Sequence, residues 1–277
     1  MELRFTKMHG LGNDFVIADL PRGAAPPAGE TLRRLANRRT GIGFDQLLLL
    51  EPPRRPGTEV YYRIFNADGD EVEQCGNGAR CIAQLLGERK GTTGEGTLTL
   101  DSAGGLVQAR IGNGGQVSVN MGVPRFAPRD LPFEATTEAY IYTIEVAGTE
   151  LEIGAVSIGN PHAVLTVPSV ESAPVDRIGP ALERHPRFPR RTNVEFMEIV
   201  DAGHIRLRVH ERGTGETRAC GTGACAAVAV GRRHGVLGEA VAVDLPGGRL
   251  AVQWAGPGEP IWMTGPAEKS FEGTIDL

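Results

Sequence analysis

The pentapeptides CGNGA at residues 75–79 and CGTGA at residues 220–224 decide the fold of this 277-residue chain. Each places a cysteine and two glycines directly before a run of helix-forming residues, and the two copies lie 145 positions apart (220 minus 75). Repetition at a fixed offset is typical of a duplicated structural unit. The sequence therefore predicts two copies of one fold, each with a cysteine at the start of a helix.

Other polar landmarks keep nearly the same offset. Three further pairs, displaced by 145 to 147 positions, are GNDFV (from Gly12) with GNPHAV (from Gly159), Gln46 with Asn193, and Asn66 with Glu211. One match between glycine-rich pentapeptides would be weak, but four matches in one order indicate two pseudo-symmetric domains. We place the domains at residues 1–121 and 122–265, because the stretch 120–130 is rich in proline and polar residues.

Alternating apolar and polar residues predict strands in most of the chain. EVYYRIFN, the glycine-punctuated stretch from 96 to 122 and the stretch from 139 to 159 each indicate hairpins. Helices are predicted at 30–38, 78–86 and 222–234, with Gly87 and Gly235 as C-terminal caps. The expected class is α+β, with a curved, mostly antiparallel sheet or barrel wrapped around a central helix in each domain.

Charge and hydropathy exclude two classes of partner. The chain has 29 Lys and Arg against 34 Asp and Glu, a net charge of -5, and no basic tract suited to nucleic acid. The apolar run at 47–50 is too short to span a bilayer, and the first ten residues lack a secretory apolar segment. We therefore expect a cytoplasmic protein without nucleic-acid or membrane partners.

The four cysteines are too few for a disulfide framework in a chain of this length. Cys75 with Cys81 and Cys220 with Cys225 have C-x5-C and C-x4-C spacing, which differs from the C-x2-C of structural zinc sites. A redox pair would normally lie in one C-x-x-C segment. Core packing suits Cys81 and Cys225, which fall inside predicted helices.

Cys75 and Cys220 are placed for reactivity instead. A helix start offers unpaired backbone N–H groups and a partial positive charge, which bind carboxylates and lower the pKa of a cysteine. Two such thiols on opposite faces of one molecule could invert a carbon next to a carboxylate. One thiolate would remove the proton and the other thiol would deliver a different one.

The sequence favours such chemistry without a cofactor. A pyridoxal enzyme would need a lysine for its Schiff base, and Lys7, Lys90 and Lys269 all lack a recognisable cofactor-binding context. Glycine-rich phosphate-binding fingerprints are also absent from the sequence.

Six sequence blocks resemble the signatures of the diaminopimelate epimerase family. They are HGLGNDF, FNADG, QCGNGARC, GNPHAV, TNVEF and ERGTGETRACGTGACA, and the resemblance runs from residue 8 to about residue 227. The resemblance implies an isomerase that interconverts LL- and meso-2,6-diaminopimelate, in lysine and cell-wall precursor biosynthesis, with two cysteines and neither cofactor nor metal. It also implies that the final strand, 266–277, joins the first domain, and that two chains can form a homodimer.

The resemblance assigns roles to individual residues. It implies Cys75 and Cys220 as the catalytic pair, with His162 and Glu211 tuning their protonation. It implies as substrate-binding residues Asn13, Gln46, Asn66, Gly76, Asn77, Asn160, Asn193, Glu211, Arg212, Gly221 and Thr222. These types suit a substrate with an ammonium and a carboxylate at each end. Simpler interpretations remain for three of them: His162 as a hydrogen-bonded, half-buried histidine, and Asn13 and Asn66 as turn residues.

Three rival functions remain. Proline racemases and hydroxyproline epimerases share the paired cysteines but typically carry histidine where this chain has Asn77. Isomerases of the phenazine-biosynthesis type do not rely on a cysteine pair. A carboxylate-binding module without catalysis would not need both thiols.

Overall fold

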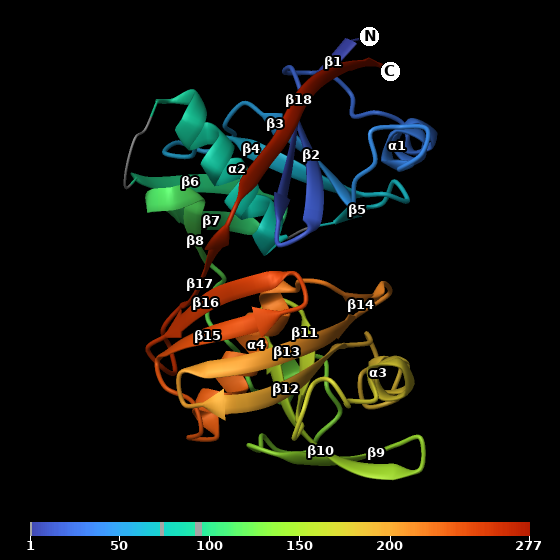
Figure 1. Ribbon diagram of the computed structural model, residues 1–277, viewed down its shortest axis with the longest axis vertical. Helices are drawn as coiled ribbons and strands as arrows, with labels where there is room; N and C mark the ends of the chain where they lie inside the picture. The colour runs from blue at the N-terminus through green and yellow to red at the C-terminus, as the bar shows by residue number, and fades with distance from the viewer. Residues whose placement is uncertain (1, 73–74, 92–95) are drawn as a thin grey trace. The chain divides into compact units, whose positions relative to one another are not determined.

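The computed structural model describes residues 2–72, 75–91 and 96–277, which form two compact units (Figure 1). Unit 1 comprises residues 1–119 and 265–277, and unit 2 comprises residues 120–264. Each unit combines a mixed sheet with two helices, so the predicted α+β class is confirmed. Within the described ranges, every helix falls short of the length and hydropathy that a bilayer span requires.

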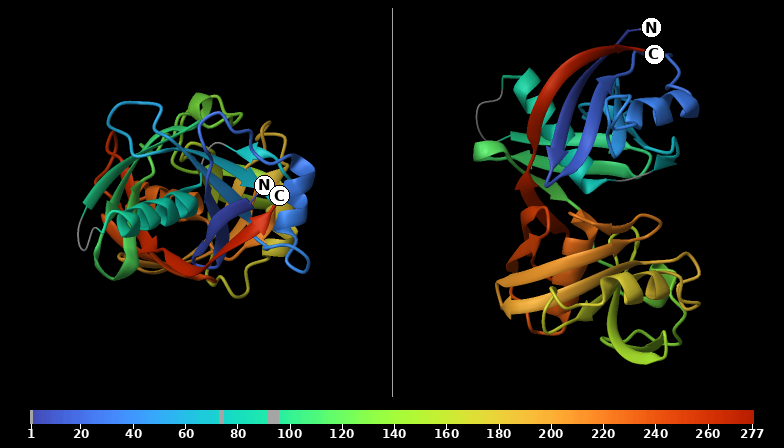
Figure 2. Two further views of the ribbon diagram at one scale, coloured as in Figure 1. Left: turned by 90° about the horizontal axis from the view of Figure 1, so that it is seen from above. Right: turned by 45° about the vertical axis from the view of Figure 1, so that its right-hand side comes forward.

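Unit 1 is built from two helices, eight strands of its main run and one returning strand. In chain order they are β1 (Glu2–Gly10), β2 (Asn13–Asp19), α1 (Gly29–Ala36), β3 (Gln46–Glu51), β4 (Tyr61–Asn66), β5 (Glu71–Val72), α2 (Gly76–Arg89), β6 (Gly96–Ser102), β7 (Gly105–Ile111), a 3-10 turn (Asn113–Gly115), β8 (Gln116–Asn120) and β18 (Glu268–Asp276). The last strand, β18, pairs antiparallel with β1, as Figure 2 shows.

Unit 2 repeats this order of elements. They are a 3-10 turn (Pro128–Asp130), β9 (Tyr142–Val146), β10 (Thr149–Ser157), β11 (Pro161–Thr166), α3 (Val175–Glu183), β12 (Asn193–Asp201), β13 (His204–Glu211), β14 (Gly215–Thr217), α4 (Gly221–Arg233), β15 (Ala240–Leu245), β16 (Gly248–Trp254) and β17 (Ile261–Pro266). From β10 to β17 the sequence of strands and helices matches that from β1 to β8.

The pairing pattern is repeated as well. Most pairs are antiparallel, but β2 runs parallel to β3 and β4 to β6, and the corresponding pairs β11 with β12 and β13 with β15 are also parallel. The register pair Phe15 with Gln46 returns as His162 with Asn193, each displaced by 147 positions. The duplication read from the sequence is therefore present in the hydrogen-bonded register.

The central helices fill the interior of each unit. From Ala224 to Val230 every residue of α4 is buried, and strands β10 to β13 and β16 contact it. A helix that is apolar all round needs cover on every side, which a curved sheet supplies. In unit 1, α2 contacts β1, β2, β6 and β7 in the same way.

The three predicted helices are confirmed, with one error at a helix end. Gly87 lies inside α2, which continues to Arg89, so its predicted role as a C-terminal cap is wrong. A Cβ atom at Gly87 would lie 2.5 Å from Cδ1 of Ile111, so close packing against β7 accounts for this glycine. Gly235 follows the end of α4 with φ of +75°, as a capping glycine does.

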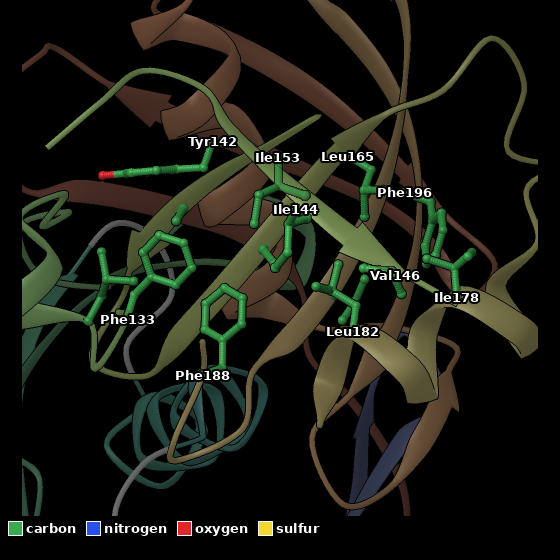
Figure 3. Packing of buried hydrophobic residues seen from close by; sticks show 14 of the residues in the cluster. Phe133, Tyr142, Ile144, Val146, Ile153, Leu165, Ile178, Leu182, Phe188 and Phe196 are labelled. Atoms are coloured by element: carbon green, nitrogen blue, oxygen red, sulfur yellow. The ribbon is translucent and has the colours of Figure 1, made fainter. Parts of the chain in front are cut away.

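Helix α3 was not predicted, because Pro180 lies within it and a proline normally interrupts a helix. The burial of one face of α3 compensates for the cost of this proline. Figure 3 shows Ile178 and Leu182 of α3 among Val146, Phe196 and other apolar side chains of the unit 2 cluster. Tertiary packing therefore outweighs the local cost of the proline.

Candidate active site

Cys75 and Cys220 are the N-cap residues of α2 and α4. Both have extended backbone, with φ of -148° and -113°. The Cys75 Sγ accepts a hydrogen bond from the Gly78 N–H at 3.5 Å, and the Cys220 Sγ accepts one from the Gly223 N–H at 3.4 Å. Sulfur thus takes the place that a serine or aspartate oxygen usually takes at a helix start. Gly76 with Asn77, and Gly221 with Thr222, form the first helical positions.

The surroundings of Cys220 keep its proton on the sulfur. Burial raises the pKa of the Cys220 thiol well above its usual value, and the nearby carboxyl groups of Glu211 and Glu195 raise it further. Hydrogen bonds from Thr222 and the Gly223 N–H oppose this effect. The expected lowering of the cysteine pKa at a helix start is therefore wrong for Cys220, because desolvation and like charge outweigh the hydrogen bonds to the sulfur.

Cys81 and Cys225 lie within the helices and are fully buried. Burial raises the pKa of the Cys81 thiol to about 12. The prediction that these two cysteines pack the core is confirmed.

In unit 1 four predicted amides form two hydrogen-bonded pairs. Asn77, in the first turn of α2, donates from Nδ2 to Oδ1 of Asn13 at 3.2 Å. Gln46 donates from Nε2 to Oδ1 of Asn66 at 2.8 Å, because these residues are register partners at the ends of β3 and β4. Asn77 stands two residues after Cys75, so the first pair connects Asn13 to the first turn of α2.

A network of charged residues holds the side-chain amide of Asn13 in one orientation. Asp45 accepts a hydrogen bond from Asn13 Nδ2 at 2.9 Å, and Arg38 bridges Asp45 and Asp14 at 2.7 Å each. The buried Lys7 ammonium lies 2.6 Å from Asp14 Oδ2. Burial alone would raise the pKa of Asp14, but hydrogen bonds from Arg38 and Lys7 hold it well below its usual range. The Asn13 amide is therefore fixed with its nitrogen toward Asp45.

In unit 2 the strand register gathers the polar residues on one face of the sheet. Residues in register, and those two positions apart on one strand, point to the same side. By the registers of β11 to β14, this face carries His162, Asn193, Glu195, Glu211 and Thr217. The space beside Gly223 in α4 is filled by Glu195 and Val209, so the same face meets the helix start that holds Cys220.

Asn193 holds the turn that follows β13. Its Oδ1 accepts the Arg212 N–H at 3.0 Å and its Nδ2 donates to the Pro161 carbonyl at 3.0 Å. The Arg212 guanidinium is exposed and donates to the Arg190 carbonyl at 3.1 Å. Asn193 therefore connects β11, β12 and the loop of Arg212 within unit 2.

His162 is fully buried and bonded at both ring nitrogens. Nδ1 lies 2.7 Å from Oε1 of Glu195, and Nε2 lies 2.9 Å from Oδ1 of Asn160. Burial raises the pKa of Glu195, with His162 opposing the shift. His162 is thus more deeply buried than the alternative interpretation of a half-buried histidine assumed.

The sequence interpretation missed three side chains that hold predicted residues. They are Asp45, which accepts a hydrogen bond from Asn13, Glu195, which lies against Nδ1 of His162, and Thr217, whose hydroxyl donates to Glu211. Asp45 directly precedes Gln46, and Glu195 stands within TNVEF, but only the amides of these two stretches were chosen. The spacing of Asn193 and Glu195 indicated that their side chains share one face, because alternate residues of a strand point to the same side.

Solved structures share this fold. A hydroxyproline epimerase from Agrobacterium vitis is 18% identical, with a TM-score of 0.70, over 99% of this chain and 92% of that one. A phenazine biosynthesis protein of the PhzF family from Bacillus anthracis is 19% identical, with a TM-score of 0.73, over the whole of both chains. At such identities the likeness concerns the fold alone.

Sequence relatives are much closer. Residues 5–127 and 154–270 match the family described as diaminopimelate epimerase. Proteins named diaminopimelate epimerase from Thioalkalivibrio sulfidiphilus and Pseudomonas aeruginosa are 55% and 53% identical, over 100% of this chain and of each relative. With both capping cysteines in place, the chain belongs to the diaminopimelate epimerase family.

Proposed function

We propose that this protein is an isomerase that interconverts LL- and meso-2,6-diaminopimelate with two cysteines and no cofactor, in lysine and cell-wall precursor biosynthesis. The observation that carries the proposal is the repeated helix start. In both units a cysteine caps the helix with the same hydrogen bond and is followed by Gly-Asn-Gly or Gly-Thr-Gly. The 52–55% identity to full-length diaminopimelate epimerases supports the choice of substrate.

The reaction exchanges one proton on the α-carbon. The thiolate of one cysteine removes the α-proton, and the electron pair of the broken C–H bond spreads into the adjacent carboxylate. The thiol of the other cysteine then protonates the opposite face, so that one S–H bond forms and one breaks. Burial and the carboxyl groups of Glu211 and Glu195 favour the protonated form of the Cys220 thiol, which suits the role of the acid in one direction. In the reverse direction the two residues exchange roles.

The helix starts stabilise the charge that develops. The first residues of α2 and α4, Gly76 with Asn77 and Gly221 with Thr222, present backbone N–H groups at helix starts, which attract a carboxylate. Negative charge grows on the carboxylate oxygens as the proton leaves, so these donors bind the transition state more strongly than the substrate. His162 and Glu211 act on the protonation of the thiols.

The remaining polar residues bind the ends of the substrate. Arg212 suits the distal carboxylate, since a guanidinium can grip it with two hydrogen bonds. The side chains proposed to bind the substrate's ammonium and carboxylate groups are Asn13, Gln46, Asn66, Asn160, Asn193 and Glu211. Such a set would discriminate against proline, which has no second amino-acid end.

Turnover of competing substrates tests the function. The purified protein, without added cofactor, should epimerise LL-diaminopimelate and leave L-proline and hydroxyproline essentially unchanged. Faster inversion of proline than of diaminopimelate would contradict the proposal. We further propose that the protein acts in the cytoplasm as a homodimer without a nucleic-acid partner, which light scattering and a nucleic-acid binding assay can test.

A further inference from the structure

The pair of His162 and Glu195 is unusual for a protein core. Both side chains are fully buried, and Nδ1 of the histidine lies 2.7 Å from Oε1 of the glutamate. Burying ionisable partners has a desolvation cost that their attraction often fails to repay. Apolar residues of similar volume at these positions would fill the same space, so packing alone does not account for the pair.

Unit 1 shows that the fold does not need these polar residues. The positions that correspond to His162 and Glu195, each displaced by 147, are Phe15 and Leu48. Phe15 and Leu48 lie against Gly78, much as Glu195 lies against Gly223, the third helical residue after each cysteine. The same scaffold is thus built once with an apolar pair and once with a histidine and a carboxyl group.

The hydrogen bonds of His162 fix its protonation. Both ring nitrogens face oxygen atoms, Oε1 of Glu195 and Oδ1 of Asn160, and the amide oxygen can only accept. Both contacts are hydrogen bonds only when Nε2 carries a proton and a second proton lies between Nδ1 and Glu195. Glu195 Oε2 has no hydrogen-bond partner among the described residues, which favours the proton on the carboxyl group. Whether this proton lies on Nδ1 or on the carboxyl group, the total charge of the pair is zero.

The hydrogen bond from His162 leaves the nitrogen of the Asn160 amide for a ligand. The Oδ1 of this amide is taken by the Nε2–H of His162, so its Nδ2 group is left to donate to a ligand. The equivalent residue in unit 1, Asn13, is held the other way, with Nδ2 bonded to Asp45 and Oδ1 as the acceptor. Equivalent asparagines are thus set with opposite polarity, one suited to a carboxylate and one to an ammonium group.

We propose that Glu195 is a positioning residue, which keeps Nε2 of His162 protonated and thereby holds Asn160 with its N–H groups toward the substrate carboxylate. The role toward substrate rests on the proposed function, whereas the proton arrangement within unit 2 does not. The Asp45 contact in unit 1 and the Glu195 relay in unit 2 therefore hold equivalent asparagines in opposite orientations.

Two substitutions at Glu195 separate this role from packing. Glu195→Leu introduces the residue that unit 1 carries at the equivalent position, so the core stays filled but the partner of Nδ1 is lost. We expect its kcat/KM for LL-diaminopimelate to fall about 10- to 100-fold, mainly through a higher KM, because the substrate carboxylate loses an oriented donor. Glu195→Gln, whose amide can donate to Nδ1, should stay within about fivefold of the wild type.

A spectroscopic measurement tests the proton arrangement without turnover. The ¹⁵N chemical shifts of the His162 ring, assigned by comparison with His162→Gln, should show a protonated Nε2 in the wild type and in Glu195→Gln. Because this measurement uses no substrate, it holds even if the protein proves inactive on diaminopimelate. That inactivity would count against the proposed function and not against the relay.

The control is another histidine and carboxylate pair in unit 2. His204 and Asp244 lie 2.7 Å apart and are partly exposed, and neither contacts the residues of the candidate site. Asp244→Asn should leave both KM and the His162 signals unchanged. Two results would overturn the proposal: wild-type kinetics in Glu195→Leu, or a wild-type His162 protonated only at Nδ1. The second keeps the proposal testable even if Glu195→Leu does not fold.

Discussion

Serine and alanine at the two cysteine positions separate the structural role of each thiol from its chemical role. Each sulfur caps a helix by accepting one backbone N–H, at 3.5 Å for Cys75 and 3.4 Å for Cys220. Serine is a preferred N-cap, whereas replacing a capping side chain by alanine costs about 1 kcal/mol. For a unit of this size, that loss lowers the melting temperature by about 3 °C.

Thermal unfolding should therefore distinguish serine from alanine, whereas turnover should be lost with both. Cys75→Ser and Cys220→Ser should unfold within about 1 °C of the wild type, whereas the alanine variants should unfold about 3 °C lower. All four variants should lose at least about 100-fold in kcat, because a hydroxyl is too weak an acid to replace a thiol in proton transfer. A serine variant with near-normal kcat would refute the thiol assignment. A serine variant as unstable as alanine would refute the capping argument.

Three further predictions follow from single contacts. Hydrogen bonds from Arg38 and Lys7 keep the pKa of Asp14 below its value in the unfolded chain. This carboxylate therefore stabilises the fold at neutral pH, and the stabilisation is lost as the pH falls below about 4. In Asp14→Asn, the free energy of unfolding measured in urea should fall less steeply as the pH is lowered through the acidic range. Gly154→Ala should lower the free energy of unfolding by about 1–3 kcal/mol, because its Cβ would lie 2.3 Å from Cγ1 of Val230 on α4, and an unchanged urea midpoint would contradict this packing. Thr217→Val removes the hydroxyl that donates to Glu211 and should reduce kcat roughly tenfold, with a fall in melting temperature of only about 3 °C.

Much of the fold could be predicted because the offset between the two sequence repeats also relates their strand pairings. The offset of 147 that relates Gln46 to Asn193 in the sequence relates the same residues in the parallel strand pairs. Helix α3 could not be predicted, since Pro180 conceals a helix that only its buried partners stabilise. Gly87 was mistaken for a cap because a sequence does not distinguish a glycine that ends a helix from one that packs against Ile111.

The sequence predicts a set of candidate site residues but not their electrostatics. The position of Cys220 at a helix start indicated a lowered pKa, yet burial and two neighbouring carboxyl groups raise it. The desolvation of the thiol depends on every element that packs over the sulfur, and the sequence around Cys220 does not show which elements these are. Likewise Asn13 and Asn160 look alike in the sequence, and only their partners Asp45 and His162 show that their amides face opposite ways.

The central claim is that two thiols exchange the α-proton between opposite faces of one carbon. Turnover of LL-diaminopimelate in deuterium oxide, stopped early and analysed by mass spectrometry and NMR, tests it most directly. The account predicts one solvent deuterium at the inverted centre of the meso product and almost none in the remaining substrate, because a separate acid supplies the new hydrogen. A product that keeps the original hydrogen would contradict it, since a single base would then have returned the proton it removed.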